Sequence, residues 1–134
     1  MASVKDINTL IGCVEKFHDS FGISNNYEPT INLSKEDIQL RFDLLKEENN
    51  EYIEAAKNGD MIEVADALGD LMYILFGTIM KHGMQHKIVE VFEEIQKSNM
   101  SKLNVDGKPI YREDGKVLKG PNYFKPDIKT ILEK

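Results

Sequence analysis

The sequence EENNEYIEAAKNGDMIEVADALGD, residues 47–70, decides both the fold and the chemistry that this chain of 134 residues can support. It reads as two helical segments separated by the turn Lys-Asn-Gly-Asp at residues 57–60. Because a helix rotates by about 100° per residue, spacing places each side chain on a face. Glu48 projects between two apolar rows of the first segment, and Glu51 lies at their edge. These rows consist of Ile38, Phe42, Leu45, Tyr52 and Ala56, and of Leu44 and Ala55.

The second segment repeats the combination of carboxylates with apolar surface. Glu63, Asp66 and Asp70 fall within roughly 60° of one another around the helix axis. The sequence that follows, LMYILFGTIM at residues 71–80, is apolar nearly all round, which is typical of a buried helix. Carboxylates on apolar faces of adjacent helices repel each other and lose hydration. The pattern therefore predicts that a cation binds between the two helices.

Outward from this stretch, periodic apolar residues and helix-terminating glycines predict an all-α fold. Helices are expected over residues 3–20, 35–57 and 60–82, with a fourth beginning near Gln85. Ser34 has the position of an N-cap, with Asp37 three residues later completing a box-like start. The prediction is a single domain, 1–134, in which residues 1–97 form a bundle of four to five helices.

Residues 98–134 differ from the bundle in both pattern and charge. Residues 1–96 carry 18 acidic and 8 basic side chains, whereas residues 97–134 carry 5 acidic and 9 basic ones. Two Asp-Gly pairs, at 106–107 and 114–115, predict turns, and a small hairpin is expected across the second pair. A short helix is expected from Pro126 to Leu132. The prediction is an irregular basic tail that closes over a substrate.

Composition excludes several classes of protein. A formal net charge of −6 argues against non-specific binding of nucleic acid. The single cysteine, Cys13, allows no disulfide within the chain, and the N-terminus lacks the pattern of a signal peptide. The longest apolar block is too short to span a membrane. A cytoplasmic protein without membrane association is the expectation.

The order Glu47-Glu48-x-x-Glu51, then Glu63-x-x-Asp66 after a short turn, resembles the MazG-like all-α NTP pyrophosphatases. This superfamily includes dimeric dUTPases and phosphoribosyl-ATP pyrophosphohydrolases. The tail is similar to the C-terminal signature of one branch of the superfamily, in the segments SNMSK (98–102), DGK (106–108) and KGPNY (119–123). One departure affects the site, because the run Glu-Glu-Leu-Gly-Asp of many relatives reads Asp-Ala-Leu-Gly-Asp at 66–70. The second acidic pair is therefore either Glu63 with Asp66 or Asp66 with Asp70.

The resemblance implies hydrolysis of a (deoxy)nucleoside triphosphate to the monophosphate and pyrophosphate, with Mg²⁺ as cofactor and Mn²⁺ as a substitute. Carboxylate oxygens suit Mg²⁺, and no Cys or His intrudes to favour zinc. The metal ligands are expected to be Glu48, Glu51, Glu63 and Asp66. Either Glu47 or Glu48 is expected to take the proton from the attacking water.

Substrate phosphates require further cations and donors. The expected substrate-binding residues are Asp70, Asn99, Lys102, Lys116, Lys119, Asn122 and Tyr123, with His18 added by the resemblance. His18 also lies on or beside an apolar stripe, which is more often the position of a core histidine.

Two alternatives remain open at this stage. One is phosphoribosyl-ATP hydrolysis in place of hydrolysis of a (deoxy)nucleoside triphosphate. The other is a helical module that binds metal and interacts with other proteins without catalysis. The apolar surface of residues 71–80 exceeds what one small bundle can cover, so a homodimer or homotetramer is expected.

Overall fold

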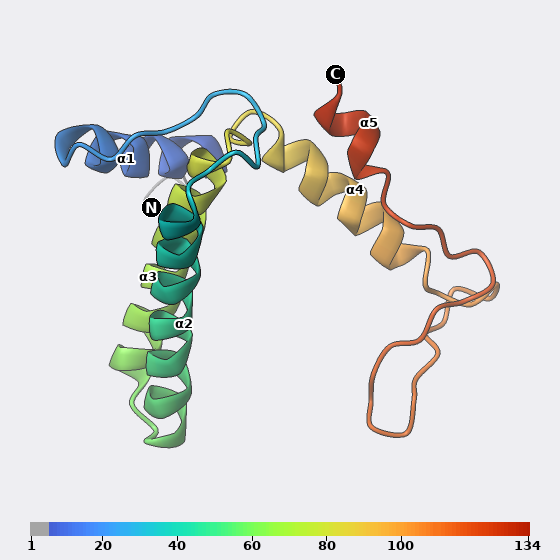
Figure 1. The fold of residues 1–134 in the computed structure, drawn as a ribbon. Coiled ribbons are helices and arrows are strands. Elements are labelled where there is room, and N and C mark those ends of the chain that lie inside the picture. Colours follow the sequence, from blue (N-terminus) through green and yellow to red (C-terminus); the bar gives the residue numbers. More distant parts are fainter. Residues whose placement is uncertain (1–5) are drawn as a thin grey trace. The chain divides into compact units, whose positions relative to one another are not determined.

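The computed structural model describes residues 6–134, and within them the chain forms five helices and no strand (Figure 1). The predicted all-α class is therefore confirmed. The residues expected to begin the first helix, 3–5, lie outside the described residues. The chain divides into two compact units, 1–86 and 87–134, which are described separately. The helices are α1 (Ile7–Ser20), α2 (Lys35–Lys57), α3 (Met61–Lys81), α4 (Ile88–Met100) and α5 (Ile128–Leu132).

Side-chain caps start the three helices of the first unit. Asp6 accepts a hydrogen bond from the backbone N–H of Thr9, and Asp60 accepts one from that of Glu63. Ser34 accepts from the N–H of Asp37 at 3.0 Å, so the predicted N-cap of α2 is confirmed. These caps satisfy N–H groups that have no partner within the helix.

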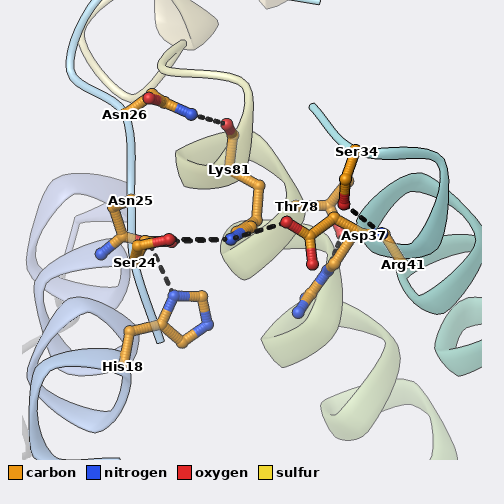
Figure 2. Close-up of polar contacts among 9 residues, drawn as sticks. All are labelled: His18, Ser24, Asn25, Asn26, Ser34, Asp37, Arg41, Thr78 and Lys81. Atoms are coloured by element: carbon orange, nitrogen blue, oxygen red, sulfur yellow. Dashed lines mark hydrogen bonds and ion pairs between the residues drawn. The ribbon is translucent and has the colours of Figure 1, made fainter. Parts of the chain in front are cut away.

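The Asp37 carboxylate has a partner outside its own helix. It lies 3.8 Å from the ammonium group of Lys81, which is at the end of α3 (Figure 2). Asp37, which the sequence placed in the box-like start of α2, therefore also links the beginning of α2 to the end of α3.

Helices α2 and α3 form an antiparallel hairpin and make the main helix–helix contact of the first unit, with α1 packing on α3 (Figure 1). Gly59 makes the turn with φ +67°. Small side chains, Ala55 on α2 and Ala67 on α3, are buried. Their size allows two helices that both carry carboxylates to approach closely.

The segment 24–30 binds the C-terminal end of α3. Asn26 donates from its backbone N–H to the carbonyl of Met80 at 3.0 Å and from its side chain to the carbonyl of Lys81 at 2.7 Å. The N–H of Thr30 donates to the carbonyl of His82 at 3.0 Å. The carbonyls at the end of α3 lack the donors that a further turn of helix would offer, and this segment supplies donors to them.

The end of α3 also explains why α4 starts later than expected. The sequence predicted a start near Gln85, but α4 begins at Ile88. Gln85 is buried, and its side-chain N–H donates to the carbonyl of Asn26 at 2.8 Å. Gln85 thus belongs to the contact with segment 24–30, and the new helix forms only after it.

The second unit consists of α4, the irregular segment 101–127 and α5, which packs on α4. The hairpin expected across Asp114-Gly115 is reduced to one antiparallel bridge, between Tyr111 and Val117. The buried Ser98 donates its hydroxyl to the carbonyl of Phe124 at 2.8 Å, which attaches the tail to α4. Among residues 6–134 no helix is both long enough and apolar enough to cross a membrane.

The turn after α3 provides a matched test of these contacts. Gly83 has φ +66°, and a Cβ there would lie 2.1 Å from the carbonyl oxygen of Glu28. Gly59 has nearly the same φ, but a Cβ would meet nothing within 4 Å. We expect Gly59→Ala to lower the free energy of unfolding by about 1–2 kcal/mol from backbone strain alone. Gly83→Ala should lower the free energy of unfolding clearly more than Gly59→Ala does, because segment 24–30 must also move.

Urea unfolding of both variants, followed by circular dichroism, measures the difference. Equal losses would show that the contact between Gly83 and Glu28 adds nothing to stability.

Candidate metal centre

Three carboxyl groups converge where α2 and α3 face each other. Glu48 and Glu51 project from α2 and Asp70 from α3, and one oxygen from each lies within 4.8 Å of the others. Glu48 and Asp70 are half-buried, whereas Glu51 is exposed. We call Glu48, Glu51 and Asp70 the carboxylate group.

Glu48 has the least favourable environment for a negative charge. Its Oε2 atom is buried and has no hydrogen-bond partner. Removal from water raises the pKa of Glu48 to about 7, and the carboxyl groups of Glu51, Asp70 and Glu47 contribute to the rise. An unpaired buried acceptor is costly, so Glu48 is stabilised when it gains a proton or a cation.

Asp70 is shifted in the same direction. Burial raises the pKa of its carboxyl, and the neighbouring carboxylates of Asp66 and Glu51 raise it further. Two residues from opposite helices therefore bind protons more tightly than usual for the same physical reasons. Shared upward shifts are typical of carboxylates that are held together at a functional site.

The structure separates the other acidic residues from this group. Glu63 and Asp66 are exposed and line, together with Glu51, an adjoining hollow of about 400 Å³. The Asp60 carboxylate caps α3, which accounts for its position without any role in catalysis. The sequence left open whether the acidic pair of α3 is Glu63 with Asp66 or Asp66 with Asp70. In the structure, the α3 residue that lies with Glu48 and Glu51 is Asp70.

Glu47, the other candidate for the general base, is exposed on α2 and lies outside the carboxylate group. It is still close enough to raise the pKa of Glu48. Its carboxylate is thus available to solvent beside the group.

His18 lies in the interior with 3% of its surface exposed. Its Nδ1 atom is 2.7 Å from the side-chain oxygen of Asn25, with which it forms a hydrogen bond (Figure 2). Its Nε2 atom is 2.9 Å from the point where a Cβ on Gly77 would lie. This burial leaves little surface for direct contact with a ligand, so the environment is that of a packed core histidine.

The remaining predicted substrate residues all belong to the second unit. Lys119 lies over the ring of Tyr123, 4.8 Å from its centroid. The next residue, Gly120, is pressed against the chain at Lys102, because a Cβ there would lie 2.7 Å from the Lys102 carbonyl oxygen. Lys102, Lys119 and Tyr123 are therefore gathered in one region of this unit. Asn99, Lys116 and Asn122 are exposed.

Sequence reasoning missed two buried cations of the first unit, Arg41 and Lys81. A signal for Arg41 was available: it stands seven residues, nearly two turns, before Glu48, and so faces the same side of α2. Lys81 gave no comparable signal, because its partners in segment 24–30 are distant in sequence.

The carboxylate group suits a hard divalent cation. It offers oxygen atoms alone, and it includes an acceptor that is buried and unpaired. Among the described residues 6–134, no ion pair involves Glu48, Glu51 or Asp70. Mg²⁺ and Mn²⁺ prefer such ligands, and a few carboxylates usually share the ion with substrate phosphates.

Comparison with known proteins agrees with this site. The family model of phosphoribosyl-ATP pyrophosphohydrolases matches residues 14–99. An uncharacterized protein of Acanthamoeba polyphaga mimivirus, L479, is 31% identical over 67 residues, which are 50% of this chain and 27% of that protein. The chain thus spans about a quarter of the length of this curated relative.

The fold and the carboxylate group define an all-α protein with an acidic cluster between two helices. The chain belongs to the phosphoribosyl-ATP pyrophosphohydrolase family, part of the MazG-like all-α NTP pyrophosphatase superfamily. Membership implies a pyrophosphohydrolase type of activity on a nucleotide and leaves the particular substrate open. The acidic cluster is consistent with the divalent metal site of this family.

From the raised pKa of Glu48 we predict how the stability of the metal-free protein depends on pH. Between its usual value of 4.5 and about 7, folded Glu48 binds more protons than unfolded Glu48. The contribution of Glu48 to the free energy of unfolding therefore rises as the pH falls through this window. We expect Glu48→Gln to exceed the wild type in stability by about 1–3 kcal/mol at pH 8. The difference should close as the pH approaches 5.

Urea unfolding in the presence of a chelator, at pH 8 and at pH 5, checks this expectation. Glu54→Gln is the control, since Glu54 is an exposed carboxylate of α2 outside the carboxylate group. A Glu48→Gln variant no more stable than the wild type at pH 8 would contradict the assigned environment of Glu48.

Proposed function

We propose that this chain is a Mg²⁺-dependent nucleoside triphosphate pyrophosphohydrolase that converts a (deoxy)nucleoside triphosphate to the monophosphate and pyrophosphate. The observation that carries the proposal is the convergence of Glu48, Glu51 and Asp70 around a buried, unpaired oxygen. Three carboxyl groups this close repel one another when ionised, so the group favours a cation that compensates their charge.

In this proposal Glu48, Glu51 and Asp70 hold the metal ion, with Glu63 and Asp66 beside them in the adjoining hollow. When bound, the ion supplies charge that offsets the phosphates and the carboxylates. Glu47 lies outside the group and is exposed, so it is free to accept the proton of the attacking water. The water oxygen forms a bond to the α-phosphorus, and the bond to the bridging oxygen breaks to release pyrophosphate.

The basic second unit suits the phosphates of the substrate. The packing of Gly120 sets the main chain at Lys102 beside the residue that follows Lys119, and the ring of Tyr123 supports Lys119. We propose that this lysine pair, with Asn99, Lys116 and Asn122, binds the triphosphate and helps to exclude water.

Phosphoribosyl-ATP is the second candidate substrate, and the family match favours it specifically. The same bond, between the α-phosphate and β-phosphate, is broken in both reactions, so the carboxylate group serves either substrate. Discrimination between phosphoribosyl-ATP and a nucleoside triphosphate must therefore come from residues that contact the base and the sugar.

A substrate panel tests the proposal. Pyrophosphate release is measured with the four dNTPs, the four NTPs and phosphoribosyl-ATP, with Mg²⁺ or Mn²⁺. We expect Glu48→Gln and Asp70→Asn to lower kcat at least about 100-fold with the preferred substrate, as loss of a charge-stabilising group does elsewhere. Asp66→Asn should also lower kcat, and its rate relative to Asp70→Asn shows which α3 carboxylate matters more.

Binding of Mn²⁺ without turnover of any nucleotide would instead favour a metal-binding interaction module without catalysis. Near-normal turnover by Glu48→Gln would remove Glu48 from the site.

The lysine pair is tested separately. Lys102→Ala and Lys119→Ala should each lower kcat/KM about tenfold to a hundredfold, as expected for loss of one charge-assisted contact. Lys129→Ala is the control, because Lys129 is exposed on α5 and pairs with Glu133. If all three variants match the wild type in steady-state kinetics, the tail does not bind the phosphates.

Assembly is expected from the apolar residues that α2 and α3 leave exposed. They include Ile38, Leu40, Phe42, Ile53, Leu68, Met72, Tyr73 and Leu75. Exposed apolar surface of this extent is typical of an interface between subunits. We predict a homodimer or homotetramer at micromolar concentration, and light scattering that gives the mass of a single chain would refute it.

A further inference from the structure

Arg41 joins α2 to α3 at a point where a charged side chain is unexpected. Only 8% of its surface is exposed. Its Nε donates to the hydroxyl of Thr78 at 3.0 Å (Figure 2). One terminal nitrogen donates to the carbonyl of Ile74 at 2.9 Å. Thr78 donates in turn to the same carbonyl at 2.8 Å. The planar guanidinium therefore fixes α2 against one particular turn of α3.

The space for this contact is provided by Gly77. A Cβ at Gly77 would lie 2.7 Å from the terminal nitrogen of Arg41 and 2.9 Å from Nε2 of His18. His18 comes from α1 and is held by its hydrogen bond to Asn25. The absence of a side chain at Gly77 thus allows groups from α1 and α2 to reach the same point on α3.

The Arg41 contact and the carboxylate group share one register. Arg41 precedes Glu48 by seven residues on α2, and Asp70 precedes Gly77 by seven residues on α3. Seven residues are nearly two helical turns, so each pair lies on one face of its helix. The two helices are antiparallel (Figure 1). The position that sets Arg41 against Gly77 therefore also sets Glu48 against Asp70.

The repulsion within the carboxylate group acts against this register. A slide of α2 along α3, or its rotation about its own axis, would separate Glu48 from Asp70 and relieve their mutual repulsion. The same movement would break both hydrogen bonds of a buried guanidinium, which is costly in the interior.

We propose that Arg41 is a positioning residue for the metal centre, holding α2 and α3 in the register that brings Glu48 and Glu51 to Asp70. The inference rests on the metal site in the proposed function. Arg41 acts through helix register, since its side chain is occupied by Thr78 and Ile74.

The test is the affinity of the full chain for Mn²⁺, titrated by electron paramagnetic resonance at a temperature where circular dichroism shows each variant folded. Thr78→Val removes the acceptor of the Arg41 Nε but keeps the charge and the shape, and Thr78→Ser restores the hydroxyl. We expect Thr78→Val to weaken Mn²⁺ binding about tenfold, the lower end of the loss seen when an outer support of a metal site is removed. Thr78→Ser should bind nearly as the wild type does.

Gly77→Ala provides a second, independent variant. Its Cβ displaces the end of Arg41, so Mn²⁺ binding should weaken to a similar extent. Gly12→Ala is the matched control within a helix, because a Cβ there meets nothing within 4 Å. In an Arg41→Met background Gly77→Ala should cause little further loss of Mn²⁺ affinity if it acts through Arg41. A loss as large as in the wild-type background would instead come from the contact of Gly77 with His18 and would count against the inference.

The possible outcomes are distinct. If the wild type binds no Mn²⁺, the metal site and this inference both fail. If the wild type binds Mn²⁺ and the Thr78 and Gly77 variants bind it equally well, even with lowered melting temperatures, Arg41 supports only the fold and the inference alone is overturned.

Discussion

The contact between α2 and α3 must hold together groups that repel each other. Three carboxyl groups lie within 4.8 Å, and one buried oxygen has no partner, so this part of the contact opposes folding. The favourable interactions in the rest of the contact must exceed that cost in free energy. Small buried residues, Ala55 and Ala67, allow close approach, and the hydrogen bonds of Arg41 fix the register two turns away. The site thus stores unfavourable electrostatic energy that a cation would relieve.

The other end of α3 is fixed by main-chain chemistry. Carbonyls of its last turn and of His82 accept hydrogen bonds from segment 24–30, and Lys81 donates to the carbonyl of Ser24 at 2.9 Å. This segment follows α1 directly, so the bonds that complete α3 also keep α1 against it. At this same end, remote from the turn of the hairpin, Lys81 also pairs with Asp37 of α2, which joins the two long helices where they would otherwise separate most easily.

The two units have complementary chemistry. The first presents carboxylates that suit a metal ion, and the second presents lysines that suit phosphate. The family match covers residues 14–99, which include Glu48, Glu51 and Asp70, and leaves most of the basic unit outside it.

Much of the fold was determined by local sequence. Periodic apolar residues, the cap at Ser34 and the glycine at 59 predicted α2 to the residue and α3 to within one residue at each end, because these signals act within a few positions of the chain. The start of α4 was wrong by three residues, since Gln85 is held by Asn26, a partner distant in sequence.

For the site, the sequence supplied the candidate acids but left two pairings open on α3. Spacing gives the face of one helix, whereas the choice of Asp70 depends on how far two helices have slid past each other. That displacement is set by Arg41, Thr78 and Gly77, whose roles exist only once α2 and α3 are packed together.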